Sequence, residues 1–119
     1  MAQENKSMPK IALGAWAWGN DGTFGGTLTA DDLRPIFDTA MDVGLNLWDT
    51  AYVYGMGTSE KTLGGFLQTV PRDSYYISAK FTPQCANPAA ENAVAMMFNT
   101  SAELLGTDYM ESCIIHGIT

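Results

Sequence analysis

The chain has 119 residues, of which 46% are hydrophobic and 16% charged, a composition typical of one folded domain rather than a disordered tail. Thirteen acidic and six basic side chains give a formal net charge of −7, which argues against DNA, RNA and anionic membranes as partners. The sequence contains neither the apolar core of a secretory signal nor an apolar run of about 18 residues, so we expect a cytoplasmic protein.

Strands and helices alternate among the predicted elements. In chain order these are a strand over 11–13, a helix over 29–43, a strand over 45–49, a helix over 58–68, a strand over 75–80, a helix from after Pro88 to Gly106, and a strand over 110–116. Elements that alternate at this spacing are joined by right-handed crossovers and form a parallel sheet covered by helices. The sequence therefore predicts one α/β domain over residues 1–119.

The first and the last of the three predicted helices are recognised by their apolar faces and their end signals. In segment 29–43 the apolar residues recur at helical spacing, and Thr29, Asp32 and Gly44 are suited to cap its two ends. We expect the last helix to be the longest, with one face made of Val94, Met97, Phe98, Ser101, Leu104 and Leu105.

Cysteine and histidine are too sparse for a metal site. Cys85 and Cys113 form no Cys-x-x-Cys pair, and the sequence holds a single histidine, so the spacing that zinc sites require is missing. In the cytoplasm we expect both thiols to be reduced and structural. We predict no metal site.

Ionisable side chains stand at the carboxyl ends of three predicted strands: Asp49 ends the second, Lys80 the third and His116 the fourth. In a parallel α/β sheet these strand ends meet at one rim, where such folds build their active sites. Tyr54 reaches the same rim if the loop over 50–55 folds back. We therefore expect the four side chains to converge.

Each of these residues also has an ordinary structural interpretation. A lysine at a strand end is usually solvated, an aspartate before Thr-Ala often serves as a turn or cap, and a lone histidine is often structural. We favour a functional role because the residues occur together at successive strand ends, whereas the strands are otherwise uncharged apart from Glu111.

The four residue types suit proton donation to a carbonyl oxygen. A tyrosine hydroxyl, with an ordinary pKa near about 10, is a weak acid at neutral pH, but an adjacent ammonium favours its phenolate. Lys80 is the candidate ammonium, Asp49 the carboxylate that compensates its burial, and His116 a group that orients the substrate oxygen. No nucleophile or metal is expected nearby, which favours reduction over hydrolysis, and the hydride then has to come from a nicotinamide cofactor.

These residues lie within motifs that resemble the N-terminal part of the aldo-keto reductase family. The matching strings, which follow the family's order over essentially the whole chain, are Gly14-Ala15-Trp16, GLNLWDTAYVYG over 44–55, Ser59-Glu60, Ser78-Ala79-Lys80-Phe81 and Ile115-His116. The resemblance implies a (β/α)8 barrel of the TIM type and NADPH-dependent reduction of a small aldehyde or ketone. It also implies a catalytic tetrad of Asp49, Tyr54, Lys80 and His116, with Tyr54 as the proton donor.

The resemblance further implies a cofactor site at Ala15, Trp16 and Asp49. Ala15 and Trp16 match the loop that in the family lies against the nicotinamide, although many members have Thr at the position of Ala15. The segment from Glu111 to Cys113 replaces the family's usual Asp-Leu-Tyr-like run, and we assign no role to Glu111 or Cys113.

Length is the largest departure from the family, because a complete barrel needs about 250 residues. We interpret the chain as the first four strands and three helices of a barrel, apparently truncated, without the later strands that hold most of the family's cofactor contacts. We favour a piece of a longer reductase and expect the piece alone to be inactive. A second copy that closes the ring, or an exchange of elements between chains, is the other possibility, because open sheet edges favour association.

A second function class stays open on the sequence alone. The chain could be a half-barrel or barrel relative that keeps the tetrad residues for packing and acts as a binding or regulatory module through self-association. Such a module would expose an apolar surface that becomes buried on association.

Overall fold

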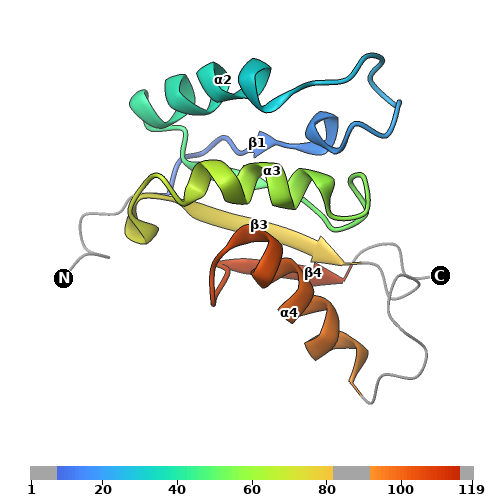
Figure 1. Ribbon diagram of the computed structural model, residues 1–119. Coiled ribbons are helices and arrows are strands. Elements are labelled where there is room, and N and C mark those ends of the chain that lie inside the picture. Colours follow the sequence, from blue (N-terminus) through green and yellow to red (C-terminus); the bar gives the residue numbers. More distant parts are fainter. Residues whose placement is uncertain (1–7, 82–91, 116–119) are drawn as a thin grey trace.

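A computed structural model describes residues 8–81 and 92–115 (Figure 1). Four parallel strands form one sheet in the order β1-β2-β3-β4. The strands are β1 (Leu13–Gly14), β2 (Leu47–Asp49), β3 (Tyr76–Phe81) and β4 (Ser112–Ile115). The helices are η1 (Trp16–Gly19), α2 (Ala30–Asp42), α3 (Thr58–Leu67), η2 (Arg72–Ser74) and α4 (Ala93–Leu105).

Over residues 8–81 and 92–115 the chain therefore has the predicted α/β alternation, with one described α-helix between each pair of consecutive strands. Helix α3 packs against both α2 and α4 (Figure 1). β1 and β4 lie at the two edges of the described sheet, which is open. This is the strand order of the first part of a (β/α)8 barrel, in which each strand pairs with its successor.

Helix α2 begins and ends where its capping residues predict. The Thr29 side chain accepts a hydrogen bond from the backbone N–H of Asp32, and the Asp32 carboxylate accepts one from the backbone N–H of Thr29. Gly44, with a φ of 83°, provides the left-handed stop. Leu33, Phe37 and Ala40 of its predicted apolar face are buried, but Ile36 is 52% exposed, because it lies beside the open edge at β1.

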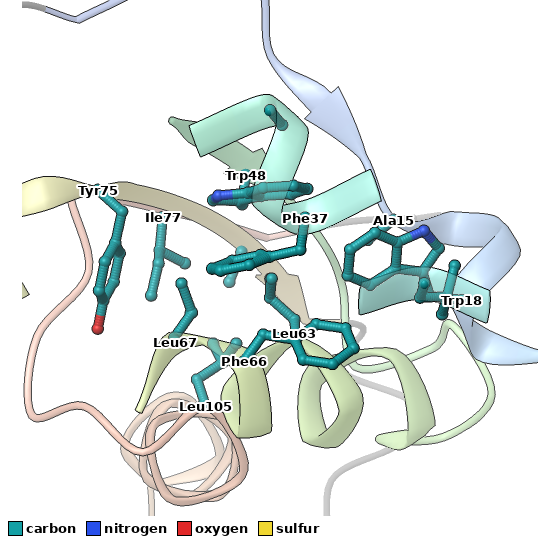
Figure 2. Packing of buried hydrophobic residues seen from close by; sticks show 13 residues of the cluster. Ala15, Trp18, Phe37, Trp48, Leu63, Phe66, Leu67, Tyr75, Ile77 and Leu105 are labelled. Atoms are coloured by element: carbon teal, nitrogen blue, oxygen red, sulfur yellow. The ribbon is translucent and has the colours of Figure 1, made fainter. Parts of the chain in front are cut away.

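An aromatic cluster joins α2, β2 and η1 (Figure 2). The ring of Phe37 stacks on Trp48 with their centroids 5.2 Å apart, and Trp18 packs against the same indole at 5.4 Å. Phe66 of α3 completes the cluster through contacts with Phe37 and Trp18. Pairs of this kind add about 0.5–1.5 kcal/mol each beyond the burial of their area. The cluster fixes β2, and with it Asp49, relative to the segment that carries Trp16.

Most predicted boundaries lie within two residues of the observed ones, and the differences come from pairing. The opening strand is Leu13–Gly14 rather than 11–13, because only these two residues pair, with Trp48 and Asp49 of the short β2. Helix α4 has 13 residues, the same length as α2, so it is not the longest; its predicted start after Pro88 lies outside the described residues.

No helix in the described part of the chain has the length and apolar character needed to cross a membrane.

Candidate active site

Lys80 and Asp49 form an ion pair at the carboxyl ends of β3 and β2. The Lys80 Nζ donates a hydrogen bond to Asp49 Oδ1 at 2.7 Å. The register places Asp49 opposite Ser78, two residues before Lys80, so both side chains project from the same rim. Lys80 is mostly buried and Asp49 partly exposed. An ammonium at such a position is stable because a carboxylate compensates its lost hydration.

The loop after β2 brings Tyr54 to this ion pair. The backbone N–H of Tyr52 donates to the carbonyl of Lys80 at 3.0 Å, and that of Ser59 donates to the carbonyl of Tyr54 at 3.1 Å. Gly55, at a φ of 72°, lies so close to the backbone of Gly19 that a Cβ atom would overlap it. These contacts hold the loop so that the centroid of the Tyr54 ring lies 5.5 Å from Lys80 Nζ.

Trp16 forms a wall beside Tyr54. The two rings stack with centroids 5.7 Å apart and an interplanar angle of 13°, and Phe24 meets Trp16 edge-on at 5.2 Å. Trp16 is 46% exposed. Neighbouring Ala15 is fully buried, and its backbone N–H donates to the carbonyl of Asp49 at 2.9 Å. A hollow of about 240 Å³ opens at this wall, lined by Trp16, Asp21, Val53 and Tyr54.

The structure thus brings together five of the residues singled out in the sequence: Ala15, Trp16, Asp49, Tyr54 and Lys80. His116 and Cys85 lie outside the described residues. Cys113 is a free, exposed cysteine on β4, and the partial desolvation of its thiol, followed by the Glu60 carboxylate, raises its pKa above the ordinary value. Within residues 8–81 and 92–115 no three His, Cys, Asp or Glu side chains gather as metal ligands.

A buried hydroxyl pair behind the site is absent from the sequence prediction. The Ser59 hydroxyl donates to the carbonyl of Ala15 at 2.7 Å and pairs with the hydroxyl of Thr50 at 2.9 Å. Because Ser59 has only one hydroxyl proton, Thr50 donates in the second contact. The pair joins three segments of the site: the loop of Trp16, the residue after Asp49 and the start of α3. Its partners lie far apart in sequence, so local patterns gave no signal beyond the Ser59-Glu60 motif.

Glu60, the next residue, is fully buried. Burial raises its pKa from 4.5 to about 7, and the Ser101 hydroxyl on α4 lies close enough to lower it in part. Neither carboxylate oxygen forms a hydrogen bond of normal geometry with any described residue. Glu60 therefore carries a proton through much of the pH range below neutrality.

The sequence matches the model of the aldo/keto reductase family over residues 10–119. The chain is 40% identical over 74 residues to a D-threo-aldose 1-dehydrogenase from a Pseudomonas species, a match that covers 62% of this chain and 22% of the relative. It is also 40% identical over 67 residues to a chloroplastic pyridoxal reductase from Arabidopsis thaliana, covering 52% of this chain and 18% of that protein.

A solved structure supports the same assignment. An aldo-keto reductase from Klebsiella pneumoniae, crystallised in complex with NADPH, superposes with a TM-score of 0.74 at 26% identity, over 94% of this chain and 37% of that one. The chain spans less than half the length of each of these relatives. The family match and the superposition together show that the chain belongs to the aldo/keto reductase family of oxidoreductases and forms the first part of its (β/α)8 barrel.

Proposed function

We propose that this chain carries the catalytic side chains of an NADPH-dependent reductase that converts an aldehyde or ketone into an alcohol. The observation that carries the proposal is the convergence of the Lys80–Asp49 ion pair on the Tyr54 ring. Tyr54 donates the proton to the carbonyl oxygen as negative charge develops there. Lys80 favours loss of that proton, Asp49 holds Lys80 in place, and His116 orients the carbonyl.

The cofactor fits the residues at the rim. Trp16 is 46% exposed and stacks against Tyr54, which places a partly exposed aromatic surface for a nicotinamide ring beside the proposed proton donor. Trp16 and Asp49 would contact it, and NADPH bound there supplies hydride. Ala15, the third contact that the resemblance implies, is fully buried and would instead hold the Trp16 segment against β2 through its hydrogen bond to the carbonyl of Asp49. The Klebsiella pneumoniae relative was crystallised in complex with NADPH, which favours this cofactor for the present chain.

The site works, in this proposal, when further strands complete the barrel around it. The described sheet is open at β1 and β4, and additional chain or a second copy would pair with these edges. In this proposal residues 1–119 form one structural unit, the N-terminal half of a barrel. The completed protein acts in the cytoplasm on a small carbonyl substrate, and the unit alone is inactive.

Replacing Tyr54 by phenylalanine tests the assignment. In a protein that contains this chain and the remaining strands, Tyr54→Phe should lower kcat for 4-nitrobenzaldehyde by about 100- to 10,000-fold, because the hydroxyl acts in the transition state. The Kd for NADPH, measured by tryptophan fluorescence, should change by less than about twofold. Tyr52→Phe, in the same loop, is the matched control and should keep its turnover. Loss of NADPH binding in Tyr54→Phe, with turnover no worse than that loss explains, would contradict the proposal.

A titration of the isolated 119-residue chain with NADPH tests the need for a completed barrel. We expect no saturable binding, since most cofactor contacts would come from further strands. Tight binding by the chain alone would show that a second copy or an exchanged element completes the site.

The alternative is a binding module that acts through self-association. The apolar groove beside α2 favours it: about 420 Å³ in volume, it includes Leu13, Ile36 and Val43 in its lining. A molecular size that rises with concentration, without NADPH binding or turnover in the completed protein, would favour the module over the enzyme.

A further inference from the structure

The loop between η1 and α2 is closed by a single side chain. The Asn20 side-chain amide donates to the carbonyl of Leu28 at 2.9 Å, and its oxygen accepts from the backbone N–H of Leu28 at 2.7 Å. These two bonds join the ends of the loop, so the segment from 21 to 27 has a fixed base. The loop presents Asp21 and Phe24 to the indole of Trp16.

Asp21 is oriented as an anion at the wall of the hollow. Its Oδ1 accepts a hydrogen bond from the backbone N–H of Thr23 at 2.9 Å, and its Oδ2 accepts one from Trp16 Nε1 at 3.2 Å. Hydrogen bonds from Thr23, and then from Trp16, lower the pKa of the Asp21 carboxyl below its ordinary value. The group is therefore ionised at neutral pH.

Asp21 gives the hollow a negative charge. It is the one charged residue among the four that line the hollow; the other three are Trp16, Val53 and Tyr54. Lys80, the cation of the described site, is already paired with Asp49 at 2.7 Å. An opposite charge on a ligand would be attracted to this wall, whereas a like charge would be repelled.

We propose that Asp21, which is exposed at the rim of the hollow, selects ligands of the Tyr54 hollow by charge: neutral and cationic carbonyl compounds are favoured over those with a carboxylate or phosphate close to the carbonyl. The substrate part of this inference rests on the proposed reductase function. The charge part concerns the hollow itself and can be tested on the isolated chain.

Collisional quenching of tryptophan fluorescence measures the local charge. Trp16 is 46% exposed, whereas Trp18 and Trp48 are 5% and 1% exposed, so quenchers in solution reach Trp16. Iodide, caesium and acrylamide serve as anionic, cationic and neutral probes. Asp21→Asn should raise the iodide quenching constant, relative to acrylamide, by about twofold and lower that for caesium, since a unit charge next to the indole is removed.

Two further variants control for net charge and for lost hydrogen bonds. Asp42→Asn removes the same charge from the exposed far end of α2, about 20 Å along the helix from its start. It should leave the ratio of the iodide to the acrylamide quenching constant near the wild-type value. Asp21→Glu keeps the charge and should also resemble wild type. The proposal is overturned if Asp21→Asn and Asp42→Asn give the same ratio, or if quenching survives Trp16→Phe.

Turnover tests the substrate class in a protein with the completed barrel. The substrates are 4-carboxybenzaldehyde and its neutral methyl ester, which carry the aldehyde at the same position of the same ring. Asp21→Asn should raise kcat/KM for the carboxylate by about three- to tenfold relative to the ester. An unchanged ratio overturns charge selection of substrates. Failure to reduce even the neutral ester overturns the proposed function instead, while the quenching ratio still decides the charge of the hollow.

Discussion

At the scale of single residues, Glu60 has an ionisation that must couple to folding. Its carboxyl is fully buried, and burial raises its pKa from 4.5 to about 7. The native state therefore binds a proton more tightly than the unfolded chain, so the free energy of unfolding falls as pH rises from about 4.5 to 7. The stabilisation from protonated Glu60, about 3 kcal/mol, is fully present below the unfolded pKa of 4.5 and is lost once the pH exceeds the folded pKa of about 7.

The variant Glu60→Gln tests this coupling, because glutamine fills the same space without ionising. We expect its free energy of unfolding, from urea denaturation, to exceed that of wild type at pH 8 and to decline less between pH 5 and pH 8. Glu103→Gln, an exposed change on α4, is the matched control and should leave the wild-type decline in place. Equal slopes for Glu60→Gln and wild type would exclude Glu60 as the source.

The site itself divides into residues that local sequence identifies and residues that it does not. Asp49 and Lys80 could be expected at one rim because each ends a strand of a parallel sheet. Ser59 and Asp21 could not, since their partners are chosen by tertiary structure: the Ser59 hydroxyl bonds the carbonyl of Ala15, and the Asp21 carboxylate bonds the indole of Trp16. Hydrogen bonds between distant segments leave no periodic pattern in a sequence.

At the scale of elements, Arg72 connects η2 to the segment that leads into β4. Its guanidinium makes two hydrogen bonds to Glu111, at 3.0 and 3.1 Å, and lies over the rings of Tyr75 and Tyr109. Glu111 also accepts the backbone N–H of Ile77 at 2.8 Å. Sequence analysis assigned no role to Glu111, because these partners are more than 30 residues apart along the chain.

Arg72→Lys should therefore destabilise the fold although it keeps the charge. Lysine cannot make the paired contacts or stack its head group between two rings, so we expect a loss of about 2 kcal/mol in the free energy of unfolding. Arg34→Lys is the control for looser contacts of the same kinds. Arg34 pairs with Asp38 where both side chains are at least 40% exposed, its hydrogen bond to Thr69 is exposed, and its guanidinium lies 5.7 and 5.5 Å from the ring centroids of Phe37 and Phe66. Its loss should therefore be the smaller one and stay under about 1 kcal/mol. Equal losses measured by urea denaturation would mean that the contacts of Arg72 carry no special stability.

Element prediction succeeded where the signal is local and failed where pairing decides. The capping residues Thr29 and Gly44 lie at the ends of α2 as expected, because capping depends on side chains within one turn. β1 is shorter and later than its apolar run suggests, because a strand extends only where a neighbour pairs with it. The apolar run at 11–13 gives no information about the length of β2.

At the scale of the whole molecule, both edges of the described sheet expose apolar side chains. Beside β1 and α2, Ile36 and Val43 are more than half exposed. Beside β4 and α4, a groove of about 600 Å³ includes Val94, Phe98 and Ile115 in its lining. Apolar patches of this kind on soluble proteins usually mark contact surfaces. Each lies at an edge strand, where unpaired backbone groups also favour association.

We therefore expect the isolated chain to associate as its concentration rises, through these two edges. Sedimentation velocity between about 1 and 100 µM should show an increasing weight-average mass, because apolar burial stabilises the complex by about 25 cal/mol per Å². Ile36→Glu and Val94→Glu each place a charge on one edge and should shift the distribution toward monomer. Met56→Glu, an equally exposed apolar side chain in the loop that follows Tyr54, is the control and should not. A compact monomer at every concentration would contradict both a ring closed by a second copy and the self-associating module. Additional chain would then be the way to close the barrel.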